Sequence, residues 1–177
     1  MTEKSCLVAE VSSRTVDIMH KRQLVLLLAF ALVFLVGCSP SSKGPYDAQA
    51  DPSAEFAGAM KRAEKDGKRV LIVFGANWCP DCRVFERKLT SRAVYDFVRE
   101  NFFTMHVDIG NWDRNMDFAA KLGKPIEKGI PSIVIVGKDG NVLYATAAGQ
   151  IAAARKMTPQ VLLKWLSDPI RKNVGEP

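Results

Sequence analysis

The sequence predicts an α/β fold with a central mixed β-sheet and helices on both of its faces. Short apolar runs of strand length, at 70–74, 102–107 and 132–136, alternate with longer segments whose apolar residues recur at helical spacing. The third run is followed by a hairpin turn, Lys138-Asp139-Gly140-Asn141, and by a return strand at 142–147. A βαβ unit followed by a ββα unit brings these strands into one mixed sheet covered by helices.

Each helix has a local signal. Phe56, Ala59 and Ala63 share one face of the first helix, and Gly67 can end it. Thr90-Ser91 interrupts the second helix, and Pro159 suits the first position of the last one. The expected helices are 52–66, 82–100, 113–122 and 158–166.

The N-terminal region differs in composition from the rest of the chain. A run of about thirteen apolar residues, Leu24 to Val36, follows His20-Lys21-Arg22. This order is typical of a signal peptide, and the run is shorter than the roughly 20 residues that a membrane-spanning helix needs. Residues 39–51 are rich in Ser, Pro, Gly, Lys and Gln, as in a flexible tether. We therefore expect a signal peptide at 1–37, a tether at 38–51 and a folded domain at 52–177.

The end of the apolar run, Leu35-Val36-Gly37-Cys38, resembles the lipobox of bacterial lipoproteins. In that family the Cys receives a diacylglycerol and the chain is cut before it. The resemblance implies that a lipid on Cys38 anchors the protein to the cell envelope, facing the periplasm. Ser39 replaces the Asp that commonly retains such proteins at the inner membrane, which favours the outer membrane. An uncleaved signal anchor, or ordinary signal cleavage nearby, is the alternative.

The first eighteen residues fit this interpretation poorly. Glu3, Glu10 and Asp17 are unusual in front of a signal core, whereas Met19 would make a compact start. We interpret Met19 as the true initiator and 1–18 as a misassigned start.

The charge distribution and the positions of the cysteines limit the possible functions. The 177 residues carry a formal net charge of +6, with basic and acidic residues intermixed and no basic block interleaved with aromatics, so we expect no nucleic-acid binding. Cys6 stands alone in a polar stretch, whereas Cys79 and Cys82 form a Cys-x-x-Cys. A disulfide framework would need more cysteines spaced across the fold, so the pair indicates one redox or metal site.

The pair lies where a buried strand gives way to a helix. At that position the free N–H groups and the dipole of the helix stabilise a thiolate on Cys79. Cys82 lies one turn inward, within disulfide reach. We expect Cys79 to be the exposed attacking thiolate and Cys82 the resolving thiol that releases a mixed disulfide.

Two segments resemble the thioredoxin superfamily: Phe74-Gly75-Ala76-Asn77-Trp78-Cys79-Pro80-Asp81-Cys82 and Gly129-Ile130-Pro131-Ser132. The resemblance covers 52–166 and implies a thioredoxin-like fold. It is strongest to periplasmic reductant modules, such as the C-terminal domain of the thiol:disulfide interchange reductases. Their Ala-x-Trp-Cys-x-x-Cys-(x)₃-Glu run is matched from Ala76 to Glu86.

The resemblance implies a role for several residues. Pro131 would follow a cis peptide bond, face Cys79 and deny a metal access to the sulfurs. The Ile130 backbone would be free to pair with a substrate strand, and Trp78 would form a wall of the site. The candidate catalytic residues are Cys79 and Cys82; the candidate substrate-binding or modulating residues are Trp78, Pro80, Asp81, Glu86, Ile130 and Pro131; Cys38 is the candidate lipidation site.

Two departures from the family pattern matter. Val73 stands where thioredoxins carry a buried Asp that helps to deprotonate the second Cys. Glu86 is a candidate replacement; the alternative is a solvated carboxylate that pairs with Arg83 or Lys88. Asp81 stands where strong oxidants have His, and a carboxylate there opposes the thiolate and favours a reductant.

The sequence therefore predicts an envelope thiol–disulfide oxidoreductase that reduces protein disulfides, without a cofactor and as a monomer. Its expected partners are envelope proteins with thiols or disulfides and an upstream thiol protein that donates electrons. An oxidase or isomerase is the enzymatic alternative. A copper- or zinc-carrying module is disfavoured because no His follows His106, which we interpret as structural or surface-exposed.

Overall fold

The computed structural model describes residues 44–146, 149–152 and 154–174. They form one unit of an α/β fold, with the elements in the order α2 (Pro52–Lys65), β1 (Arg69–Gly75), α3 (Pro80–Leu89), α4 (Arg92–Asn101), β2 (Phe102–Asp108), α5 (Met116–Lys121), β3 (Ser132–Val136), β4 (Val142–Ala145), the short 3-10 helix η1 (Ala154–Lys156) and α6 (Pro159–Val174). The signal peptide, Cys38 and the first part of the expected tether lie outside the described residues.

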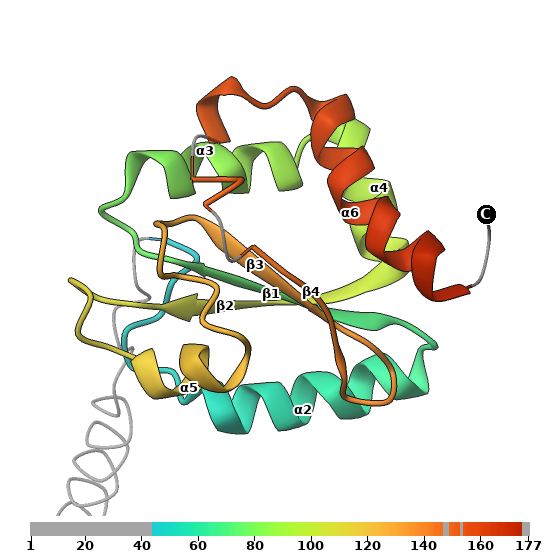
Figure 1. Cartoon of the computed structure of the whole chain (residues 1–177), viewed down its shortest axis with the longest axis horizontal. Helices are drawn as coiled ribbons and strands as arrows, with labels where there is room; N and C mark the ends of the chain where they lie inside the picture. The colour runs from blue at the N-terminus through green and yellow to red at the C-terminus, as the bar shows by residue number, and fades with distance from the viewer. Residues whose placement is uncertain (1–43, 147–148, 153, 175–177) are drawn as a thin grey trace, which may run out of the picture. The chain divides into compact units, whose positions relative to one another are not determined.

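The sheet is mixed, with strands in the order β2-β1-β3-β4. β1 and β2 are parallel, whereas β3 runs antiparallel to β1 and β4 antiparallel to β3. Helices α2 and α5 cover one face, and α3, α4 and α6 cover the other (Figure 1). The predicted fold class is confirmed. β1 lies between β2 and β3 within the sheet and has helices over both of its faces. Its residues 70–75 are therefore all buried.

Several helix boundaries follow from local chemistry. The carboxylate of Asp51 caps α2 by accepting hydrogen bonds from the backbone N–H groups of Ser53 and Ala54. The expected break at Thr90-Ser91 separates α3 from α4. The last helix is longer than expected and continues through Pro169 to Val174.

The helix expected at 113–122 begins later, at Met116. Residues 110–115 form a loop instead, in which Gly110, Trp112 and Asn115 all have positive φ. The buried carboxylate of Asp108 holds this loop, because it accepts hydrogen bonds from the Gly110 backbone N–H at 3.2 Å and from Arg114 Nη1 at 3.0 Å.

The domain begins earlier than expected. Tyr46 lies within the predicted tether, yet it is fully buried. Its backbone is fixed by Asn77, whose Oδ1 accepts from Tyr46 N at 3.2 Å and whose Nδ2 donates to Tyr46 O at 2.6 Å. Its ring fills the space beside Gly75, where an added Cβ would lie 2.4 Å from Tyr46 Cζ. The tether boundary at 51 is therefore wrong: the segment 44–51, here called the N-terminal arm, packs against the domain.

Candidate active site

Cys79 is the N-cap residue of α3. Its Sγ accepts a hydrogen bond from the Cys82 backbone N–H at 3.2 Å, so the sulfur occupies the position where a helix stabilises an anion. Pro80 is the first helical residue, where its missing N–H costs no hydrogen bond. Cys79 is only 4% exposed, so the expectation of an exposed thiol is wrong for this arrangement; a partner must approach closely or displace neighbouring groups.

Cys82 lies one turn further into the domain and is fully buried. Both cysteines are free thiols in this structure. Burial raises the pKa of the Cys82 thiol well above the usual range, and its interaction with Cys79 raises it further. Cys82 therefore keeps its proton at neutral pH. A thiol that caps the helix and a proton-retaining thiol one turn behind it suit an attacking and a resolving role.

The segment before β3 closes the site from the other side. The Ile130–Pro131 peptide bond is cis, as predicted. The Ile130 carbonyl oxygen lies 3.9 Å from Cys79 Sγ, so this segment does lie beside the thiol.

Trp78 lies at the surface beside Cys79 and is 50% exposed. Its indole N–H donates to the Gly110 carbonyl oxygen at 2.8 Å, which ties it to the loop at 110–115. Trp112 of that loop is exposed as well. This placement fits the expected role of Trp78 as a wall of the site.

Asp81 has a partner that the sequence does not reveal. Its carboxylate accepts two hydrogen bonds from Arg155 of η1, from Nε at 2.8 Å and from Nη2 at 3.0 Å. This bidentate pair is the strongest geometry between a guanidinium and a carboxylate. Arg155 therefore offsets part of the negative charge by which Asp81 is expected to oppose the Cys79 thiolate, although burial and, to a smaller extent, the charge of Asp81 still raise the pKa of Cys82.

A second contact fastens η1 to the same helix. The Lys88 ammonium donates to the backbone carbonyl oxygens of Ala154, Arg155 and Met157. Two of these carbonyls belong to η1, and the third follows it directly. The segment that carries Arg155 is thus held against α3 at two points.

Glu86 lies on α3 one turn beyond Cys82 and pairs with neither Arg83 nor Lys88, which were its expected alternatives. Its Oε1 accepts from the Tyr46 hydroxyl at 3.1 Å, and its Oε2 lies 3.0 Å from His106 Nε2. Burial raises the pKa of Tyr46, and the charge of Glu86 raises it further, with smaller contributions from the charges of Cys82 and Cys79. Glu86 is therefore part of a polar cluster close to the two thiols.

Tyr46 and Arg155 were not among the residues expected at the site, and His106 was expected to be structural or surface-exposed. The sequence does contain a signal for Tyr46: it is a lone aromatic residue in the expected tether, and Gly75 in a buried strand indicates that another group packs closely against that strand. Arg155 had none, because it is separated from Asp81 by 74 positions.

Among the residues that the structure describes, no group of three or more His, Cys, Asp or Glu side chains could hold a metal ion. Within the same ranges, no helix is both long and apolar enough to span a membrane.

Comparison with known proteins agrees with this architecture. A thioredoxin-like family model matches residues 51–138. The crystal structure of a disulphide isomerase from Xylella fastidiosa Temecula1 is similar at 36% identity, with a TM-score of 0.68, over 72% of this chain and 97% of that one. The structure titled DsbH oxidoreductase, at 16% identity and a TM-score of 0.51 over 77% of this chain and 92% of that one, shares the fold.

A protein named probable nucleoredoxin 3, from Oryza sativa subsp. japonica, is 32% identical over 104 aligned residues. The match covers 45% of this chain but only 21% of that relative. The strand-to-helix Cys-x-x-Cys, the cis-proline segment beside it and the similarity over nearly the whole Xylella protein show that this chain belongs to the thioredoxin-like family.

Proposed function

We propose that the protein is a thiol–disulfide oxidoreductase that reduces disulfides in envelope proteins through Cys79 and Cys82. The observation that carries the proposal is the asymmetry of the two thiols: Cys79 Sγ caps α3 and accepts the Cys82 N–H, whereas Cys82 is fully buried. The Cys79 thiolate attacks a substrate sulfur and forms a mixed disulfide, and one substrate thiolate leaves. Cys82 then loses its proton and attacks Cys79 Sγ, which releases the second substrate thiolate and leaves a protein disulfide.

The proposed location and partners rest on the sequence. A lipid on Cys38 would anchor the protein to the envelope, at the outer membrane, where the domain would act as a monomer. Other proteins with thiols or disulfides would be its substrates, and an upstream thiol protein would return it to the dithiol form. Because the N-terminal arm packs against the domain from Gly44 on, residues 39–43 would be the link between the lipid on Cys38 and the folded domain.

The reductive direction needs its own test, because Arg155 offsets the charge of Asp81. Equilibration of the protein with glutathione buffers measures the potential of the Cys79/Cys82 pair. We expect a value nearer to thioredoxin's, about −270 mV, than to that of the strong oxidant DsbA, about −120 mV. A value above roughly −150 mV would overturn the reductive proposal and favour the oxidase.

An isomerase is the second candidate, because the similar Xylella protein carries that description. Reduction to completion needs both thiols, whereas Cys79 alone can attack, shuffle and release a substrate disulfide. Cys82→Ser should therefore abolish net reduction. Retention of most of the activity on a scrambled disulfide substrate by Cys82→Ser would favour the isomerase.

A further inference from the structure

The N-terminal arm enters the domain beside the reactive cysteines. An added Cβ at Gly44 would lie 2.1 Å from Asn77 Oδ1, so Gly44 lies directly against the Asn77 amide. The same amide exchanges two hydrogen bonds with the Tyr46 backbone. Asn77 is two positions before Cys79, so the Cα atoms of these two residues are at most about 8 Å apart. The chain therefore joins the folded domain next to its active site.

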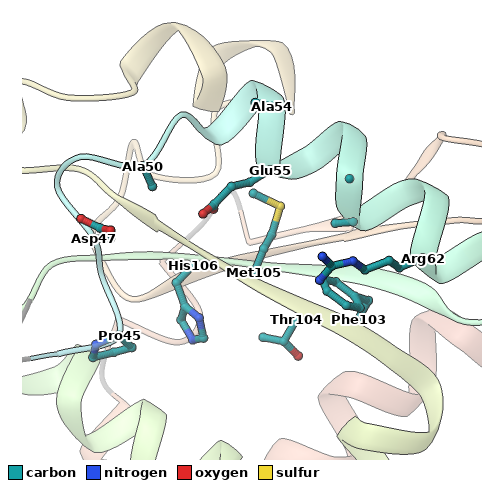
Figure 2. A pocket seen from close by; sticks show the side chains of 12 residues that line it. Pro45, Asp47, Ala50, Ala54, Glu55, Arg62, Phe103, Thr104, Met105 and His106 are labelled. Atoms are coloured by element: carbon teal, nitrogen blue, oxygen red, sulfur yellow. The ribbon is translucent and has the colours of Figure 1, made fainter. Parts of the chain in front are cut away.

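The beginning of the arm is the part that is firmly packed. Tyr46 is fully buried, and its hydroxyl donates to Glu86 of α3. Asp47 and Ala50, farther along, are exposed or half-buried and border a groove of about 590 Å³ between the arm, α2 and β2 (Figure 2). Because exposing the Tyr46 ring to water is unfavourable, the point of entry stays fixed at Gly44.

The chain between the expected lipid and this point of entry is short. Gly44 is the sixth residue after Cys38, and a fully extended chain of that length spans at most about 20 Å. If the arm were free up to Asp51, the same estimate would be about 45 Å. A domain of this size is about 35 Å across, which is more than the link can reach around. The end of the domain that carries Gly44 is therefore the end held near the bilayer.

The active site lies at this end, and the β3–β4 turn lies at the other. β1 pairs with β3 so that Phe74 is opposite Ser132, near the site, whereas Val70 is opposite Val136, just before the turn that contains Lys138. A seven-residue strand spans about 20 Å, so the turn is farther from the point of entry by about that length. Figure 1 shows the C-terminal end of α6 and the β3–β4 turn at the end of the sheet opposite to the beginning of α3.

We propose that the Cys79/Cys82 pair works in a layer within about 35 Å of the bilayer surface and reduces disulfides of proteins held at the same membrane. This inference rests on the proposed function and on the lipid at Cys38. The link and the contact between Gly44 and Asn77 set the depth of the layer. Two proteins confined to one thin layer meet at a raised effective concentration, whereas a disulfide held beyond the layer is out of reach. The protein's dithiol supplies the two electrons and the two protons: it becomes a disulfide, and the substrate disulfide becomes two thiols.

The depth of the layer is tested by energy transfer to the membrane. The mature lipidated protein with Cys79→Ser and Cys82→Ser is placed on vesicles of phosphatidylethanolamine and phosphatidylglycerol that carry an acceptor dye on some headgroups. A donor dye is attached to Arg83→Cys, one turn beyond Cys79, or to Lys138→Cys; both positions are exposed. We expect stronger transfer from position 83, and weaker transfer there after about 20 Gly and Ser residues are inserted after Ser42, which lengthens the reach about fourfold. Equal transfer from the two positions, or a wild type that carries no lipid, would overturn the proposal.

The class of partner is tested by reduction in a single turnover. The reduced, lipidated protein is mixed with a synthetic peptide closed by one disulfide, which is free in solution or held on the same vesicles by two palmitoyl chains beside the disulfide. The matched control carries Cys6→Ala and Cys38→Ala and is bound to vesicles with nickel-chelating lipid through a hexahistidine tag after Pro177, so that the end of the domain where α6 ends is held at the bilayer (Figure 1).

We expect the two anchored forms to reduce the free peptide at the same rate. The lipidated form should reduce the vesicle-held peptide about tenfold faster than the tagged form, because only the lipid holds the active-site end of the domain near the bilayer. Equal rates on the vesicle-held peptide would contradict the proposal. Failure of both forms to reduce even the free peptide would instead contradict the proposed function.

Discussion

Arg155 should control how readily Cys79 forms a thiolate, although it lies 74 positions away from Asp81. In the structure the bidentate pair with Asp81 balances the carboxylate's charge within the first turn of α3. Arg155→Gln removes the cation and leaves the carboxylate. Two like charges a few ångströms apart in a water-like dielectric repel by roughly 1 kcal/mol, so the uncompensated carboxylate disfavours the thiolate by about that amount. That value corresponds to about a fivefold loss of thiolate.

The rate of alkylation by iodoacetamide at neutral pH measures the thiolate directly, because only the thiolate reacts. Measurements on the full chain with Cys6→Ala and Cys38→Ala confine the reaction to the site. We expect Arg155→Gln to alkylate about fivefold more slowly, and the difference to shrink in about 1 M salt, where charges are screened within about 3 Å.

The matched control is the same change in the Asp81→Asn background. Asp81→Asn alone leaves the cation of Arg155 unopposed and should alkylate faster than wild type, whereas the double variant, which lacks both charges, should react about as fast as wild type. A double variant as slow as Arg155→Gln would mean that Arg155 acts through the packing of η1. No loss in Arg155→Gln would refute the charge argument altogether.

Three further predictions concern the lipid anchor, the packing of the N-terminal arm and the pH dependence of stability. Labelled palmitate should enter the wild-type protein and not Cys38→Ala, and equal labelling of the two would contradict the lipid anchor. Tyr46→Ala should lower the free energy of unfolding in denaturant by about 3–5 kcal/mol, as for other buried aromatics, whereas the exposed Tyr95→Ala should change it by less than about 0.5 kcal/mol. The free energy of unfolding of the dithiol form should fall above about pH 8.5, because the unfolded chain releases the Cys82 proton there while the native fold, which raises the pKa of that thiol, retains it. The disulfide form lacks that thiol and should not show this loss.

The fold class was predictable because its signals are local. The apolar runs, the helical spacing and the hairpin turn each operate over a few residues, and together they limit the topology to one mixed sheet. The same is true of the reactive pair. Cys79 is activated by the end of its own helix, so the order strand, Cys-x-x-Cys, helix is enough to assign it.

Tertiary structure decided the surroundings of that pair. Whether Glu86 pairs with Arg83 or Lys88, or faces inward, depends on what packs against α3, and the answer is Tyr46 from the arm and His106 from β2. The polar composition of the N-terminal arm predicts a tether. One buried aromatic ring beside Gly75 is enough to fasten it.

The charge balance at Asp81 was likewise beyond reach of the sequence. Taken alone, the residue predicts an unopposed carboxylate near the thiolate and so a reductant. Arg155 offsets part of that charge, because η1 docks on α3 through Lys88 and brings a guanidinium to the carboxylate. Periodicity and helix-end electrostatics can be read from neighbouring residues, whereas a pair of charges 74 positions apart meets only when two elements pack together.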